Sequence, residues 1–499
     1  MKKNNEAVAV EAGGVQYRRA KLWQIILYAC SALSNMAVYI LIQQASYAAS
    51  IGFAVSTTII GVILMGTRIF DAITDSLMAF VYDRVHTRFG KIRVLLIVGY
   101  IIESLGVLAM FDFMSSKGFK VLTFTLLYMV YVIGYTLVNM TNQTIPALMT
   151  NDPKQRPQVG VWLTVMNYLV PMALTIVLNS VILQKYGGTY NQAYLTAASR
   201  LVVLISGIGI LLTCIGVSAY DKPEYFEDIG KHERLKLKDM IEVLKDNQPL
   251  QSYIAAQASD KLAQVAASQS IITTMLYGIV IGNMSLATYL SVAGMFPSII
   301  FAVFGAKYAG KHGSKKGIVV WTKACIAAAA AMCGFFVALY LGMADTTQIA
   351  KLWSIPMILY VLLTLIMNGT KMCVTTSATA FMADIIDYEL DRSGRYVPAV
   401  VSGTYSLIDK IISSFGTVMA TGCVAVIGYT KTVPQPTDLL TSGIFWMTMG
   451  LMYGLPIIGW IITLIAMKPC KLDKEEMARV QQRIAEKKAA VKAEENAAG

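Results

Sequence analysis

Three ionisable residues occur at helical spacing inside an apolar stretch of this sequence: Arg68, Asp71 and Asp75. Spacings of three and four residues place their side chains on one face of a helix. If that helix spans a membrane and ends near Asp83, Asp71 lies roughly 18 Å from the edge at 1.5 Å per residue. A charge at that depth costs about 2.5–3.5 kcal/mol on insertion scales, so it normally faces a cavity or a partner. Carboxylates around a cavity can replace water around Na⁺ or accept a proton, which predicts a cation site.

A lysine lies at a similar depth in another apolar stretch. Lys410 follows Asp409, about twelve residues after the stretch begins near Pro398. An ammonium group there can neutralise the two carboxylates when no cation is bound. The alternative is a static ion-pair network that only holds helices together. Four or five buried charges at one level favour the functional interpretation, which a lone buried pair would not do.

The elements that carry these charges are long apolar runs. Of the 499 residues, 56% are hydrophobic and 14% are charged, and the mean hydropathy is +0.57. A soluble domain carries roughly 25% charged residues, and a bilayer core takes about 20 apolar residues per helix. Because only helices and closed barrels satisfy their backbone in lipid, and no ten-residue alternation occurs, we expect an all-α polytopic membrane protein with twelve transmembrane helices. The runs lie near 21–47, 56–82, 94–115, 120–149, 158–184, 198–219, 250–281, 285–306, 317–343, 350–383, 398–429 and 440–467.

The net charge of +12 is concentrated in alternate loops. Lysine and arginine collect on the cytoplasmic side of membrane proteins, so both termini are expected inside a cell (inner) membrane, with a lipid bilayer and not a nucleic acid as the partner of the positive charge. No cleavable signal precedes the first run, and the seven cysteines show no metal spacing. The basic residues that carry this argument include Lys2, Lys3, Arg18, Arg19, Lys21, Arg84, Arg88, Lys91, Arg93, Lys307, Lys311, Lys315 and Lys316.

One long polar segment divides the runs six and six. The predicted organisation is a cytoplasmic segment at 1–20, a six-helix bundle at 21–219, a linker at 220–249, a second bundle at 250–467 and a tail at 468–499. The linker contains an amphipathic stretch from Leu235 to Lys245, and the tail is either a soluble helix or disordered. Short basic reversals follow the second run of each half, at 82–93 and 307–316. Internal repeats of this kind are typical of secondary transporters, with the solute site at the membrane midplane, and the arrangement resembles the major facilitator superfamily.

Several motifs resemble a more specific family. Arg68-Ile-Phe-Asp-Ala-Ile-Thr-Asp75, followed by Asp83-Arg and Arg88-Phe-Gly-Lys91, is similar to the second helix and following loop of the glycoside–pentoside–hexuronide:cation symporters, which include the melibiose carriers. Ala383-Asp-Ile-Ile-Asp-Tyr388, with Ser393-Gly-Arg395, resembles the family signature between helices ten and eleven. Asn247-Gln-Pro-Leu250 and Lys410 match further family positions. The resemblance runs from about residue 20 to 430.

This resemblance implies roles for particular residues. It assigns the coupling cation (Na⁺, Li⁺ or H⁺) to Asp71 and Asp75 with Thr136 and Asn139 nearby, and it places Lys410 and Arg68 at the coupling step between the cation and solute sites. It also implies a cytoplasmic gating network, although solvated salt bridges are the more common role of such shallow charges. The residues of that network would be Asp83, Arg84, Arg88, Asp384, Asp387 and Arg395.

The sequence departs from the family pattern where sugar relatives hold hydroxyl groups. Asn35, Asn139 and Thr164 stand at the matching positions of two carboxylates and an arginine, and Gln143 replaces an expected aromatic residue. Lys371, Lys261 and Asp260 are polar additions within spans. The losses and gains predict a more positive cavity, so the solute-binding set would be Asn35, Asn139, Gln143, Lys371, Lys261 and Asp260, with an anionic solute such as a glucuronide or another uronic-acid glycoside. Against this, Lys261 could simply pair with Asp260, and Lys371 with an acid of the eleventh helix.

Glu103 lies in the middle of the third run and has two interpretations: a protonated acid facing lipid, or a partner of Arg68. Other classes of function fit less well. The three histidines lie in loops, and Gly305–His312 resembles a phosphate loop without its final Ser or Thr, so neither an enzyme nor an ATP-driven pump is expected. No selectivity filter indicates a channel. A neutral sugar, an amphipathic lipid or an amino-acid derivative remain alternative cargoes of a carrier that is expected to be monomeric, with no cofactor beyond the coupling cation.

Overall fold

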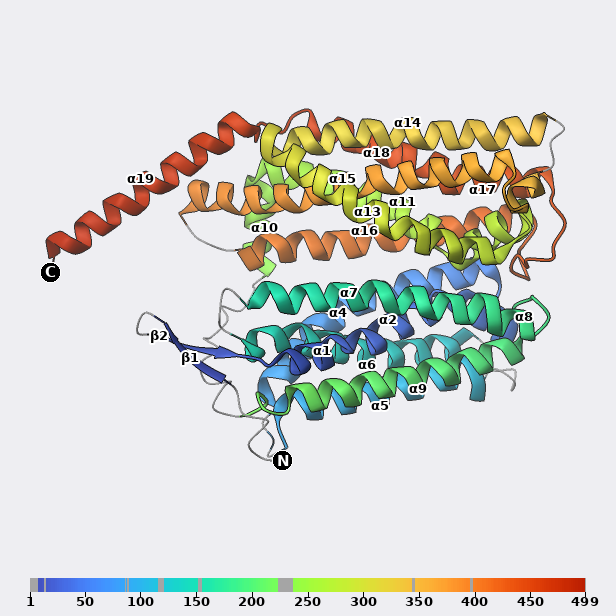
Figure 1. The fold of residues 1–499 in the computed structure, drawn as a ribbon, viewed down its shortest axis with the longest axis horizontal. Helices are drawn as coiled ribbons and strands as arrows, with labels where there is room; N and C mark the ends of the chain where they lie inside the picture. Colours follow the sequence, from blue (N-terminus) through green and yellow to red (C-terminus); the bar gives the residue numbers. More distant parts are fainter. Residues whose placement is uncertain are drawn as a thin grey trace. The chain divides into compact units, whose positions relative to one another are not determined.

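The computed structural model describes residues 8–12, 15–85, 87, 89–114, 121–150, 155–222, 237–342, 346–394 and 398–498. These residues are almost entirely helical (Figure 1). The chain forms two compact units. The first comprises Met1–His232, Gln269–Thr274 and Thr421–Leu439, and the second comprises Glu233–Ser268, Met275–Ala420 and Leu440–Gly499.

The first unit begins with a two-stranded hairpin that the sequence did not predict. Strands β1 (Val8–Ala12) and β2 (Val15–Arg19) pair antiparallel, with Val8 opposite Arg19 and Ala12 opposite Val15. Helices follow, several of them continued by π-helical turns marked η, a label that in the second unit also includes one 3-10 turn, η8. They are α1 (Leu22–Ala29), α2 (Ser31–Ile42), α3 (Ala45–Tyr47), η2 (Ala48–Gly52), α4 (Thr57–Arg84), α5 (Lys91–Leu108), η3 (Ala109–Phe113), α6 (Val121–Met149), α7 (Arg156–Ile176), η5 (Val177–Ile182), α8 (Leu183–Lys185), α9 (Gln192–Val217) and α12 (Ser270–Thr273).

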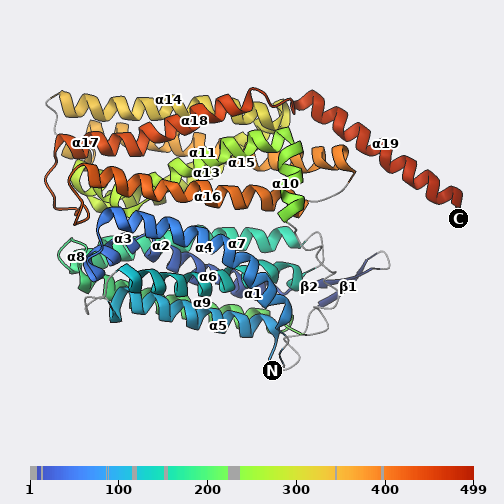
Figure 2. The ribbon, with the colours of Figure 1, turned by 180° about the vertical axis from the view of Figure 1, so that it is seen from behind.

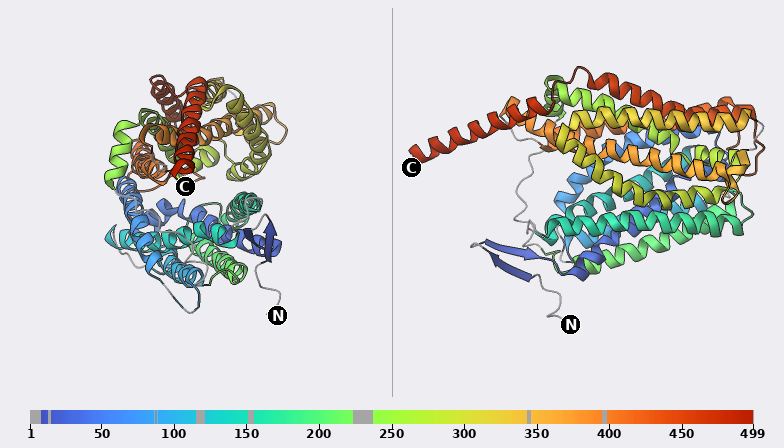
Figure 3. Two further views of the ribbon diagram at one scale, coloured as in Figure 1. Left: turned by 90° about the vertical axis from the view of Figure 1, so that its left-hand side faces the viewer. Right: turned by 45° about the horizontal axis from the view of Figure 1, so that its top comes forward.

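The second unit contains the remaining helices, which Figure 2 shows from the opposite side. Viewed along their length in Figure 3, the long helices are seen nearly end-on within each unit. The elements are α10 (Leu237–Asp246), α11 (Gln248–Ala267), η7 (Thr274–Val280), α13 (Met284–His312), α14 (Ser314–Leu341), η8 (Thr346–Ala350), α15 (Ile355–Ser393), α16 (Pro398–Val426), α17 (Ser442–Met449), η9 (Gly450–Gly454), α18 (Leu455–Met467) and α19 (Lys474–Ala498). Residues 274 and 421–426 of these elements belong to the first unit.

Ten helices of the described residues are long and apolar enough to cross a membrane, and a pair bent by 113° at Ser270–Val280 and Met284–Leu290 makes up to eleven. The all-α polytopic fold is therefore as predicted. The difference from twelve spans lies mainly in the predicted run 250–281. There α11 ends at Ala267, and the chain turns at Ser268 and Gln269 before α12 begins. The hydropathy of 250–281 predicted one continuous helix, but the polar residues Ser268 and Gln269 form a turn within it.

Glycines allow α5 and α6 to pack backbone against backbone. A Cβ atom added to Gly134 of α6 would lie 2.3 Å from the backbone nitrogen of Glu103 on α5, and one added to Gly106 would lie 2.8 Å from the nitrogen of Tyr131. Such distances leave no room for any side chain. Small residues are typical of close helix contacts in membranes, so this contact fixes which residues of α5 face α6.

We expect Gly134→Ala to destabilise the protein by at least about 2 kcal/mol, because overpacking a tight contact forces the backbones apart. The measurement is thermal unfolding in detergent. Gly160→Ala on α7 is the matched control, since an added Cβ there meets nothing within 4 Å and alanine favours a helix by about 1 kcal/mol over glycine. Equal unfolding temperatures for the two variants would contradict the proposed packing.

An acid that was not predicted from the sequence joins the C-terminal end of α9 to the N-terminus of α5. The carboxylate of Asp221, just beyond α9, accepts hydrogen bonds from the first backbone amides of α5: Lys91 (2.8 Å), Ile92 (2.9 Å) and Arg93 (3.0 Å). The Arg93 Nε also donates to Asp221 at 3.1 Å. Gly90 precedes this turn with φ +96°, and a Cβ there would overlap the Asp221 carboxylate. An acid at a helix N-terminus is stabilised by the orphan amides and the helix dipole.

In the second unit, α15 continues ten residues beyond the predicted span end at 383. It has 39 residues and ends at Gly394, whose left-handed conformation (φ +71°) is the usual helix stop. The tail is a helix, α19, and it contacts the extended part of α15 (Figures 1 and 2). Arg483 and Lys487 donate to the Asp391 carboxylate at 2.7 and 2.9 Å. Val480 and Ile484 of α19 are buried against the same cluster as Phe381 and Ile385.

Candidate functional site

The first unit brings Asp71 of α4 against α6. Thr136 is 2% exposed, and its hydroxyl donates a hydrogen bond of 2.9 Å to Asp71 Oδ1. The Tyr128 hydroxyl, also on α6, lies within electrostatic reach of Arg68 and Asp71. Asp71 and Arg68 are both half-buried. The contact that the structure shows is thus a carboxylate paired with a threonine hydroxyl, and oxygen atoms of these kinds are ligands suited to a small hard cation.

The other predicted residues of α4 are less fully described. Asp75, Asp83 and Arg84 lie on this helix, but their side chains are outside the described part of the structure, as are Arg88 and Arg395 altogether. Lys410 is half-buried on α16 in the second unit, next to Asp409, which accepts a hydrogen bond of 3.4 Å from the Tyr405 hydroxyl. That Asp71 and Lys410 share one pocket stays a prediction, because each unit is described by itself.

Amide side chains of α2 and α6 meet in the first unit. Asn142 Nδ2 donates to Asn35 Oδ1 at 3.4 Å, and Asn142 Oδ1 is buried without a hydrogen-bond partner. Of the other predicted residues on α6, Asn139 is half-buried and Gln143 is exposed. Asn142 was not among the site residues predicted from the sequence. Because Asn142 lies one helical turn after Asn139, the spacing of these residues could have placed it among the predicted site residues.

The polar additions of the second unit form a cluster from three helices. The Lys371 ammonium of α15 lies 5.7 Å from the centre of the Trp460 ring of α18. The Asp260 carboxylate of α11 is within electrostatic reach of Lys371 and adjacent to the Trp460 indole. Trp460 is 2% exposed, whereas Lys261 is exposed. The acid within electrostatic reach of Lys371 is thus Asp260 of α11, and no sequence signal pointed to Trp460.

The predicted gating acids of α15 contact other helices of the second unit. Gln481 of α19 donates to Asp387 Oδ2 at 2.7 Å, and Asp384 lies next to Ser314 at the start of α14. Glu389, a residue that sequence analysis did not select, is 1% exposed. It accepts hydrogen bonds from Asn247 (2.9 Å) and Arg392 (2.9 Å). The tail helix thus holds one of the acids that the motif assigned to a gate.

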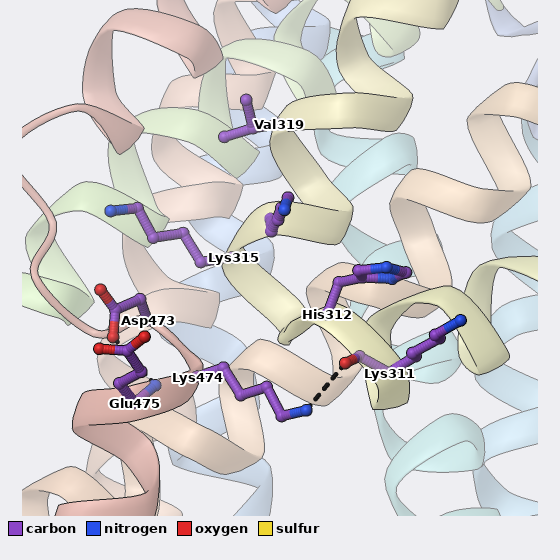
Figure 4. A pocket seen from close by; sticks show the side chains of 8 residues that line it. Lys311, His312, Lys315, Val319, Asp473, Lys474 and Glu475 are labelled. Carbon is purple, nitrogen blue, oxygen red and sulfur yellow. Dashed lines mark hydrogen bonds between the residues drawn. The ribbon is translucent and has the colours of Figure 1, made fainter.

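A basic cavity of about 580 Å³ lies where α13, α14 and the start of α19 meet. In Figure 4, Lys474 extends to the backbone carbonyl of Lys311, with a hydrogen bond of 2.9 Å. Asp473, across the cavity, caps α19 by accepting from the amides of Glu475 and Glu476. The cavity contains none of the predicted site residues. Its lining consists of Lys311, His312, Lys315, Lys316, Val319, Asp473, Lys474 and Glu475.

Solved structures with a similar fold are transporters. The nucleoside transporter NupG matches with a TM-score of 0.59 and 13% identity, over 90% of this chain and 100% of that chain. The xylose transporter XylE from Escherichia coli matches with a TM-score of 0.54 and 11% identity, over 91% and 98% of the two chains. At these identities the likeness defines the fold alone: that of a polytopic α-helical transporter.

The sequence itself identifies the family. The model of the family described as MFS/sugar transport protein matches residues 23–474, so the chain belongs to that family of membrane transporters, and it is not an enzyme. The proposed glycoside/cation symporter YagG of Escherichia coli K12 is 24% identical over 402 residues, which are 78% of this chain and 80% of that protein. A glucuronide carrier protein homolog from the same organism is 33% identical over 102 residues, covering 20% and 22% of the two chains. These relatives agree with the family resemblance drawn from the motifs.

Proposed function

We propose that this protein is a secondary active transporter that couples the entry of a small glycoside to a monovalent cation, Na⁺, Li⁺ or H⁺. The observation that carries the proposal is the Asp71–Thr136 pair, an acid and a hydroxyl 2.9 Å apart on α4 and α6 inside the first unit. Similarity to a glycoside/cation symporter over most of both chains supports the same class of cargo.

In this mechanism, cation binding at Asp71 and Asp75 neutralises their charge and releases Lys410. The solute then binds more tightly, and alternating access follows by rocking of two helical halves. Thermodynamic linkage requires that the solute raise cation affinity by the same factor. The carrier would work as a monomer in the cell inner membrane, with both termini cytoplasmic, with bundles at 21–219 and 250–467, and with gating by the charges near Asp83 and Asp387.

The solute that we favour is anionic, such as a glucuronide or another uronic-acid glycoside. Lys371 supplies a half-buried cation over the face of Trp460, and Asp260 is the acid that a solute carboxylate would displace. Asn35 supplies a neutral amide in place of a sugar-binding carboxylate, and Asn142 Nδ2 donates a hydrogen bond to it. Similarity of one segment to a glucuronide carrier homolog supports this class of solute.

A neutral glycoside is the second candidate, and one specific observation favours it. Asp260 is close enough to compensate the charge of Lys371, so the cluster needs no external anion. The two candidates therefore make different predictions for this pair: an anionic solute would displace Asp260 from Lys371, whereas a neutral solute would leave the two side chains together.

A binding screen of the purified protein separates these candidates. We expect uronic-acid glycosides to raise its unfolding temperature, and Na⁺, Li⁺ or a lower pH to strengthen that effect at least about fivefold in apparent affinity, a typical coupling. Matched neutral glycosides are the controls. Equal stabilisation by acidic and neutral solutes would exclude the anionic assignment, and stabilisation that ignores all cations would exclude coupled transport.

A further inference from the structure

Glu103 is a buried acid that the proposed transport mechanism does not use. It lies on α5, is 1% exposed, and neither of its carboxylate oxygens has a hydrogen-bond partner. No cation of the described residues lies within 4 Å of it, so the expected pairing with Arg68 is not seen. Nor does it face lipid, since the close contact with Gly134 turns it against α6. Both sequence-based interpretations of Glu103 are therefore replaced by a position inside the bundle.

Glu103 and Asp71 lie on opposite sides of α6 at nearly the same height. Gly134 faces the backbone of Glu103, whereas Thr136, two residues later, donates to Asp71. Two residues of a helix turn by about 200° and rise by about 3 Å. The Tyr131 hydroxyl of α6 is within electrostatic reach of both acids. The two carboxyl groups are thus separated by roughly the width of one helix, about 10 Å.

The charged and titratable groups around Glu103 are few. From α6 they are Tyr131 and its neighbouring tyrosines Tyr128 and Tyr135, and from α4 they are Asp71 and Arg68. On α9, Arg200 is bound to Asp112 of η3 at 2.7 Å, and Cys214 lies near Arg93 and Asp221. None of these supplies Glu103 with a hydrogen bond or an ion pair. Asp71, which like Glu103 is within electrostatic reach of Tyr131, can only oppose a negative charge on Glu103.

An ionised carboxylate without partners is very costly in an apolar interior, so such a group holds a proton instead. A unit charge about 10 Å away, at an effective dielectric constant of about 20, changes the ionisation equilibrium of a carboxyl group by roughly tenfold. Asp71 therefore favours the neutral form of Glu103 while the cation site is empty. A cation bound to Asp71 cancels this effect.

We propose that Glu103 is a second ion-binding site, specific for a proton, and that proton binding there and cation binding at Asp71 oppose each other. The inference rests on the proposed cation site. The step is a plain ionisation: the carboxyl O–H bond breaks, the proton passes to solvent and the carboxylate retains the electron pair. When Glu103 is ionised, its negative charge strengthens cation binding at Asp71, and when it is protonated, cation binding weakens.

The test compares the apparent cation affinity of the wild type and Glu103→Gln between pH 5 and pH 9, with solute binding as the readout. In the wild type we expect the apparent cation Kd to fall by about tenfold as the pH rises and Glu103 ionises. Glu103→Gln mimics the neutral acid. In this variant the tenfold fall of the apparent cation Kd is absent, and cation binding stays weak at high pH. Asp112→Asn, which alters the ion pair between η3 and Arg200 of α9, should behave as the wild type.

A second measurement does not need cation binding. Infrared spectroscopy of the cation-free protein should show the carbonyl band of a protonated carboxyl group that Glu103→Gln lacks and that weakens when Na⁺ is added. A pH profile of Glu103→Gln identical to the wild type, or no protonated carboxyl band assignable to Glu103, would overturn the inference. By contrast, a wild type in which no cation affects solute binding at any pH would refute the proposed cation site, while the infrared band of Glu103 would remain.

Discussion

Replacing Asp71 with asparagine is expected to abolish cation-stimulated solute binding while leaving the protein folded. Asparagine keeps the shape of the side chain and can still pair with Thr136, but it removes the negative charge that holds the cation. Loss of one partner of a buried charge pair costs about 3–5 kcal/mol, which corresponds to at least roughly a hundredfold loss of cation affinity. Solute binding should then be equal with and without Na⁺.

The measurement is solute affinity by calorimetry at several Na⁺ concentrations. Thr136→Val, which removes only a hydroxyl, should weaken cation binding by about threefold to tenfold, in line with one lost hydrogen bond. Asp112→Asn is the control, because Asp112 is an acid of the same unit that pairs with Arg200 of α9 and lies outside the proposed cation site. If Na⁺ still stimulates solute binding fully in Asp71→Asn, Asp71 is not part of the cation site.

The second large effect is expected at Lys371. If its ammonium group binds a solute carboxylate, Lys371→Gln should weaken binding of uronic-acid glycosides by about 10- to 100-fold, the range for a hydrogen bond to a charged group. Binding of a neutral glycoside should change by less than about threefold. Selectivity between matched acidic and neutral solutes is therefore the decisive quantity.

Lys371→Gln alone removes the positive charge that compensates the Asp260 carboxylate. The uncompensated charge can destabilise the second unit, an effect that has nothing to do with solute binding. The double variant Asp260→Asn with Lys371→Gln removes both charges and should restore folding but not acid selectivity. Lys351→Gln, at an exposed position before α15, controls for a general loss of positive charge. If the double variant still prefers acidic solutes, Lys371 has only a structural role and the neutral-solute candidate gains support.

Local patterns in the sequence predicted most of the fold. Apolar runs identified the long helices, and the helical spacing of Arg68 and Asp71 placed them on one face of α4. The close contact of α5 and α6 could not be derived in the same way. Gly134 and Glu103 are 31 positions apart, and nothing in either run alone says that one faces the other.

The candidate sites show the same limit. Asp71 was selected because one helix contains the whole motif. The cluster of Asp260, Lys371 and Trp460 draws one residue from each of three helices that are distant in sequence, so helical spacing within a single run could not bring these residues together. The β1–β2 hairpin and the contacts of α19 with α15 also depend on residues that come together only in the folded chain.

Helix α15 of the second unit is much longer than the hydrocarbon core of a bilayer is thick. Its 39 residues extend over about 58 Å, whereas the hydrocarbon core of a bilayer is about 30 Å thick. A tilt of ten degrees about its midpoint would displace each end by about 5 Å. Arg483 and Lys487 hold α19 to the C-terminal end of α15 through Asp391, so α19 would move with that end. A fluorescent probe on the outer turns of α19 would therefore register motions that begin deep in the bilayer.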